Sequence, residues 1–164
     1  MDGKLLLQAY GLTGLMLSLF SQTLFFVYLY EYADGLRPSE VFFAYEASIG
    51  RVPPECFLTG QTITFVSIVI MSVFGNLLAT RTRFVSLFAS PRPTLWLMAG
   101  QAVSVTVLAS VVYGTWFQRL FGTRVVPLEF VALASLFAAV ILCVEEARKW
   151  LVRRNVAGFK RLAW

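Results

Sequence analysis

The sequence predicts an all-α fold, a polytopic membrane protein built as a bundle of four transmembrane helices. Hydrophobic residues make up 58% of the 164-residue chain and charged residues only 14%, against about 45–50% and about 25% in ordinary soluble domains. The mean hydropathy is +0.72. A soluble domain of this size has too little interior to bury that much apolar surface. Four apolar runs, each long enough to cross a bilayer, lead to the same prediction.

The first expected span, residues 5–30, is the longest run without a formal charge. It is too long for a cleavable signal peptide, and no small-residue cleavage site follows it. The other expected spans cover residues 60–80, 94–116 and 126–146. We expect one membrane domain over residues 1–164, with an external loop at 31–59, a cytoplasmic loop at 81–93 and a cytoplasmic tail at 147–164.

The basic residues predict the orientation of these spans. Four of the fourteen, Arg37, Arg51, Arg119 and Arg124, fall on one side of the expected membrane. The other ten fall on the opposite side, and they are Lys4, Arg81, Arg83, Arg92, Arg148, Lys149, Arg153, Arg154, Lys160 and Arg161. By the positive-inside rule both termini are cytoplasmic. Because topology accounts for the net charge of +5, no nucleic-acid partner is expected.

The composition also excludes several kinds of site. The chain has no histidine, which removes histidine-based catalysis and histidine metal ligands. Its two cysteines, Cys56 and Cys143, lack the close spacing of a zinc or iron–sulfur cluster. We therefore predict no catalytic residue and no metal site.

Two amides in the expected spans are candidate functional residues. Asn76 lies four residues after Ser72 in the second span, and Gln101 lies three residues before Ser104 in the third. Each pair therefore shares one helix face, and an amide in hydrocarbon needs a hydrogen-bond partner. A hydrogen bond between helices is the favoured role of these residues, and a position on a cation pathway is the alternative.

A charged cluster ends the fourth span, where Glu145 and Glu146 are followed by Arg148 and Lys149. Glu145 can pair with Lys149 one turn later, a contact worth about 0.2–0.5 kcal/mol when exposed. The favoured interpretation is an interfacial charge cluster at the helix exit. The alternative is a fixed electrostatic joint to a neighbouring segment.

Several motifs resemble the last four membrane helices of P-type cation-transporting ATPases, in particular the sodium/potassium-pump-like alpha subunits. Ala9-Tyr10-Gly11 with Gly14 is similar to the start of that family's seventh helix. The run from Phe65 to Val69, and the run from Asn76 through Arg83 to Phe88, resemble the eighth helix and its basic exit. Pro127-Leu128 and the later Glu145-Glu146-Ala147-Arg148-Lys149 resemble the tenth helix and its charged end.

The resemblance implies a C-terminal membrane domain that supports the cation-translocating helices of a pump. The chain contains no Asp-Lys-Thr-Gly-Thr phosphorylation motif and no segment large enough for the domain that carries it. We therefore expect no enzyme activity and no cofactor in this chain alone; Mg²⁺ and ATP would serve only a complete pump. No carboxylate lies deep in an expected span, and Glu129 is close to an end.

Departures from the family pattern refine this expectation. Alignment to the eighth helix places Val73 and Asn76 where sodium/potassium pumps have a Gln and an Asp, and Ser104 lies near a position where a Glu is expected. The sodium-specific site is therefore neutral or absent. The external loop lacks the Ser-Tyr-Gly-Gln motif that binds a beta subunit, which argues against such a partner.

The expected partners are the lipid bilayer and the remaining helices or chain of a P-type ATPase. The plasma membrane is the expected location, and an organelle membrane is the alternative. A second hypothesis for the function is a small four-helix membrane scaffold or accessory subunit derived from such a domain without transport activity. A third, a channel formed by oligomers, rests only on the polar helix faces.

Overall fold

A computed structural model of the chain describes residues 11, 13–32, 39, 53–76 and 95–153. Within these residues every regular element is a helix. Most of the expected external loop, the expected cytoplasmic loop and the tail from residue 154 lie outside the described residues, and so does the first part of the span expected at residues 5–30.

Five α-helices follow one another in the described chain. Helix α5 continues without a break into a short π-helix, η2, in which backbone hydrogen bonds reach five residues back. The elements are α2 Leu15–Tyr32, α5 Pro54–Ile70, η2 Met71–Asn76, α7 Leu95–Tyr113, α8 Thr115–Phe121 and α9 Leu128–Arg153.

Proline begins α5 and immediately precedes α9. Pro54 occupies the first turn of α5, where a proline costs no helical hydrogen bond and its fixed φ suits the helix. The Pro53 carbonyl accepts a hydrogen bond from the Cys56 N–H at 2.9 Å, and the Pro127 carbonyl accepts one from the Phe130 N–H at 3.1 Å. Helix α5 therefore begins at Pro54, earlier than the span expected at residues 60–80.

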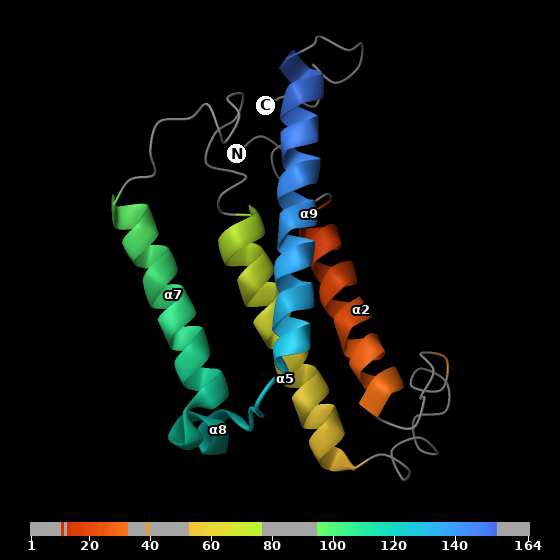
Figure 1. Cartoon of the computed structure of the whole chain (residues 1–164), viewed down its shortest axis with the longest axis vertical. Helices are drawn as coiled ribbons and strands as arrows, with labels where there is room; N and C mark the ends of the chain where they lie inside the picture. The colour runs from red at the N-terminus through yellow and green to blue at the C-terminus, as the bar shows by residue number, and fades with distance from the viewer. Residues whose placement is uncertain (1–10, 12, 33–38, 40–52, 77–94, 154–164) are drawn as a thin grey trace.

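Helices α2, α5 with η2, and α9 pack together and enclose the core (Figure 1). Buried α9 residues recur every three or four positions, so one stripe of that helix faces its neighbours. Ala134 and Ala138 lie in this stripe, and small residues let membrane helices approach closely. The core side chains of the three helices are Leu24, Tyr28, Leu29, Ile63, Val66, Ile70, Met71, Phe130, Ala134, Ala138 and Ile141.

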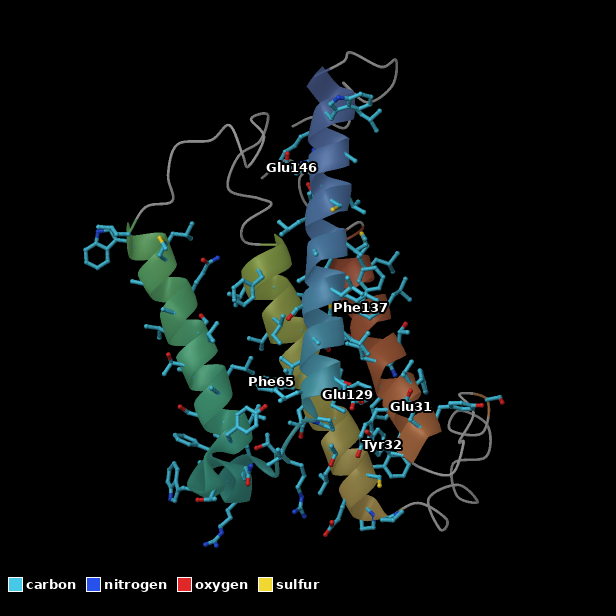
Figure 2. All side chains as sticks on the ribbon, in the orientation of Figure 1. Glu31, Tyr32, Phe65, Glu129, Phe137 and Glu146 are labelled. Atoms are coloured by element: carbon cyan, nitrogen blue, oxygen red, sulfur yellow. The ribbon has the colours of Figure 1, made fainter. Side chains whose placement is uncertain are left out.

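Aromatic contacts join α2 to α9 at two levels. The Phe20 and Phe137 rings stack with centroids 4.7 Å apart, and Tyr28 meets Phe130 edge-on at 5.4 Å. Figure 2 shows Phe137 midway along α9 on the side of α2. Helix α2 crosses α5 where Gly60 lies, and a Cβ added there would lie 3.0 Å from the Phe25 ring. The absence of a side chain at Gly60 therefore permits this close crossing.

Helix α7 runs along one edge of the bundle and contacts it sparsely (Figure 1). Val112 is its one buried residue. The helix ends at Gly114, whose extended backbone separates α7 from the short helix α8. A Cβ at Gly114 would clash with the Ser110 carbonyl oxygen, so only glycine fits this corner. Gly122 then ends α8 in the left-handed conformation, with φ of 67°.

Three described helices are long and apolar enough to cross a bilayer, namely Pro54–Phe74, Leu95–Tyr113 and Leu128–Leu151. Helix α2 is not among them. Its described part carries Ser21, Gln22 and Thr23 near the middle and Glu31 near the end. The described structure thus contains three candidate spans, whereas the sequence predicts four.

Candidate functional site

The first candidate site is a polar contact between α7 and η2. The Gln101 side-chain N–H₂ of α7 donates a hydrogen bond to the Val73 carbonyl of η2 at 3.1 Å. Gln101 is half-buried. A main-chain carbonyl oxygen has two lone pairs, so the Val73 carbonyl can accept this bond from another helix in addition to a main-chain bond. Gln101 therefore has a main-chain partner on a neighbouring helix.

The other three predicted residues lie around this contact in different ways. Ser72 is half-buried in η2, directly before Val73. Ser104 lies one turn from Gln101, and its hydroxyl donates to the Gly100 carbonyl of its own helix at 3.0 Å. Asn76 is the last residue of η2, and its side chain lies outside the described part. The structure thus brings Ser72 close to the Gln101 contact, while the Ser104 hydroxyl bonds to its own helix.

The chemistry of this contact is that of neutral hydrogen bonding. The groups at hand are an amide, hydroxyls and a main-chain carbonyl, none of which carries charge. Among the described residues no group of three or more His, Cys, Asp or Glu could hold a metal ion. Glu129 lies in the first turn of α9 (Figure 2). The described contact is therefore suited to joining helices.

A second polar junction lies at the end of the bundle that carries α8, and the sequence did not predict it. The buried Thr62 hydroxyl of α5 donates to the Leu58 carbonyl at 2.7 Å and accepts the Arg124 backbone N–H at 3.1 Å. The Arg124 side chain also pairs with Glu55 at 3.6 Å. The Thr123 hydroxyl donates to the Val111 carbonyl at 2.7 Å. Residues 122–127 are thereby tied to both α5 and α7.

No local pattern in the sequence marks this junction. Thr62 resembles any threonine in an apolar helix, where the hydroxyl commonly bonds to the carbonyl four residues back. Its partner Arg124 is 62 positions away in the chain. Only the packing of the α8 corner against α5 brings the two together.

The charged cluster of α9 pairs differently from the sequence expectation. Arg148 bonds to Glu145 at 2.9 Å and Lys149 bonds to Glu146 at 3.0 Å, both three residues apart. The expected Glu145–Lys149 pair is therefore wrong, because each carboxylate is held by the base three residues on. Lys149 is fully buried and Glu145 is 3% exposed, so these two side chains are shielded from solvent within the fold.

Comparison with known proteins places the chain in a family. The family model described as "Cation transporting ATPase, C-terminus" matches residues 1–151. The chain belongs to this family. The match spans the described helices from α2 to near the end of α9, including the Gln101 contact and the charged cluster. It does not separate sodium/potassium-pump-like members from the others. No curated protein matches the chain.

Family membership and the three long apolar helices both indicate a membrane location. This cation ATPase C-terminal domain is an integral membrane protein. Its polar contacts between helices include the α7–η2 contact and the α8 corner, and ion pairs lie near the end of α9. Hydroxyls elsewhere in the three candidate spans, such as those of Thr64, Thr106 and Ser135, bond to carbonyls of their own helix.

Proposed function

We infer that this domain supports the cation-translocating helices of a P-type pump rather than supplying its principal cation ligands. The family match over residues 1–151 carries the inference. The distribution of charge supports it. The one carboxylate of α5 and η2 is Glu55, in the first turn of α5, and α7 has no carboxylate. Helix α9 has one carboxylate in its first turn, Glu129, and two toward its end, Glu145 and Glu146. A dehydrated cation usually needs a carboxylate to offset the loss of hydration.

The proposed topology is that of a multi-pass domain with four spans and both termini in the cytoplasm. Residues 5–30 form the first span, which joins the three described candidates. The excess of basic residues on one side supports this orientation. The proposed site of action is the plasma membrane, and the motif resemblance points to a sodium/potassium-pump-like relative. ATP and Mg²⁺ act on the phosphorylating part of the pump.

The alternative function is a four-helix membrane scaffold or accessory subunit without transport activity. One observation favours it. Gln101 is engaged with a main-chain carbonyl, so a polar side chain of the expected cation pathway already serves helix packing.

One preparation distinguishes the two functions. The chain, tagged and purified from its native membrane in mild detergent, is incubated with radiolabelled ATP and quenched in acid. A pump domain should copurify with an acid-stable, hydroxylamine-sensitive phosphoenzyme whose level depends on a cation. A preparation that contains the chain and no such intermediate would contradict the pump domain and favour the scaffold.

A further inference from the structure

An open groove separates α5 from the α7–α8 corner, and its two ends differ in chemistry. The apolar part has a volume of about 380 Å³ and is lined by Leu58, Phe65, Val111 and Phe121 among others. It shares Leu58, Gly122 and Thr123 with a second hollow of about 350 Å³. That second part is lined by polar and basic residues, namely Thr115, Gln118, Arg119 and Arg124.

The apolar end points into the bundle and the basic end lies at its edge. Phe65 lies seven residues into α5 from Leu58, about 10 Å along the helix axis at 1.5 Å per residue. Figure 2 shows Phe65 partway along α5, on the side of α7. Thr115, Gln118 and Arg119 belong to α8, at the end of the bundle.

Aromatic residues indicate the depth of this groove in a bilayer. Trp96, at one end of α7, is 86% exposed, and Tyr113 and Trp116, at the other end, are 49% and 67% exposed. Tryptophan and tyrosine gather at the two membrane interfaces. Trp96 and Tyr113 are roughly 26 Å apart along the helix at 1.5 Å per residue, close to the ~30 Å hydrocarbon thickness. Helix α8 therefore lies at headgroup level.

Arg119 is the basic group at the mouth that a ligand can engage. Arg124 pairs with Glu55 and its backbone bonds to Thr62. Arg119 is exposed, and no ion pair joins it to a carboxylate among the described residues. A guanidinium binds phosphate through paired hydrogen bonds.

We propose that this groove binds one membrane glycerophospholipid, with an acyl chain between Phe65 and Val111 and the phosphate at Arg119. An apolar channel that opens at headgroup depth beside an arginine matches both parts of that ligand. The site is independent of whether the domain serves a pump or a scaffold, because it uses groups of this chain alone.

The test uses the full chain, purified and delipidated in detergent and titrated with dioleoyl phosphatidylglycerol while binding is followed by native mass spectrometry. Arg119→Gln should weaken binding by about fivefold, because one basic group near the membrane surface contributes about 1 kcal/mol. Val111→Trp should weaken it as well, by filling the apolar part. Arg153→Gln, at the far end of α9, and Val103→Trp, on an exposed face of α7, should change it little.

Two further probes separate the parts of the ligand. Dioleoylglycerol, which lacks the phosphate, and glycerol 1-phosphate, which lacks the acyl chains, should both bind more weakly than the phospholipid. Equal binding of either probe would overturn the proposal, since only one part of the lipid would then be recognised. Equal loss in Arg119→Gln and Arg153→Gln, or no loss in either groove variant, would also overturn it.

Discussion

The Thr62 hydroxyl serves two partners at once from a buried position. It is 3% exposed, donates to its own helix and accepts the Arg124 N–H. Loss of the bond from the Thr62 hydroxyl to the Leu58 carbonyl is tolerable, because that carbonyl also accepts a main-chain hydrogen bond within α5. The Arg124 N–H, whose bond to Thr62 is part-buried, has no such substitute from α5, and a shielded donor left without a partner costs free energy.

We therefore expect Thr62→Val to lower the free energy of unfolding by about 1–3 kcal/mol, since it preserves the shape of the side chain and removes the acceptor. Unfolding of the purified chain by SDS in mixed micelles measures the change. Thr64→Val is the matched control, because the Thr64 hydroxyl bonds within α5, to the Gly60 carbonyl. Equal effects in the two variants would show that the contact with Arg124 contributes nothing.

Gln101 is the residue through which α7 contacts η2, and its replacement tests that attachment. Gln101→Leu should loosen α7 by about 0.6 kcal/mol, up to ~1.7 kcal/mol, the range measured for hydrogen bonds between membrane helices. Cysteines placed at Phe65 and Val111, which line one groove across α5 and α7, report the separation through bismaleimide cross-linking in a background without Cys56 and Cys143. The cross-link yield should fall.

Ser104→Ala is the control for the α7 attachment, because the Ser104 hydroxyl bonds to its own helix. Its cross-link yield should match that of the parent. A Gln101→Leu variant with an unchanged yield would show that the α8 corner alone holds α7 in place.

At the scale of elements, the way the helices meet depends on residues whose role the hydrophobic pattern does not predict. The apolar runs predicted where helices form, because burial in hydrocarbon requires a fully hydrogen-bonded backbone. They did not predict the corner at Gly114. The expected span runs from residue 94 to residue 116, whereas α7 ends at Tyr113. They also did not predict η2, since nothing in the run Met71–Asn76 signals a change of hydrogen-bond period.

For the candidate site, too, the sequence predicted some features and not others. The need of a membrane amide for a partner predicted that Gln101 would be bonded, and its amide reaches the Val73 carbonyl. The identity of that acceptor depends on where α7 lies relative to η2, which sequence spacing does not encode. The pairing of Glu145 with Arg148 depends equally on side-chain geometry, because positions three and four residues on are both within reach on a helix.

The close approach of α2 and α5 at Gly60 can be tested by substitution. Gly60→Leu should destabilise the domain by about 1–3 kcal/mol, as overpacking of a tight contact does, because its side chain would meet the Phe25 ring. Gly100→Leu is the matched control, since nothing lies within 4 Å of a Cβ there. SDS unfolding measures both. A Gly60→Leu variant as stable as Gly100→Leu would contradict the close crossing.

At the scale of the whole molecule, the two ends of the helix bundle are expected to face opposite sides of the membrane. The start of α5, the end of α7 and the start of α9 lie together at the end with α8 (Figure 1). The distribution of basic residues predicts that this end is external. A cysteine at Arg119 should therefore react with a membrane-impermeant maleimide on intact cells, and a cysteine at Ser86 only after permeabilisation, both without Cys56 and Cys143. External labelling at Ser86 would contradict the topology.

The last prediction concerns cation binding by the domain as a whole. A ligand that binds only the folded state raises its stability, by about 2.7 kcal/mol when present at 100 times its Kd. The candidate residues of η2 and α7, namely Ser72, Asn76, Gln101 and Ser104, are all neutral, and so is the Val73 carbonyl that Gln101 contacts. Without a carboxylate, their few oxygens leave much of the cost of dehydrating a cation uncompensated. Thermal unfolding of the full chain in detergent should therefore be the same in sodium, potassium, calcium and choline chlorides at matched ionic strength. A rise in Tm with one metal cation, absent with choline and abolished by Asn76→Leu, would show instead that these neutral groups form a cation site.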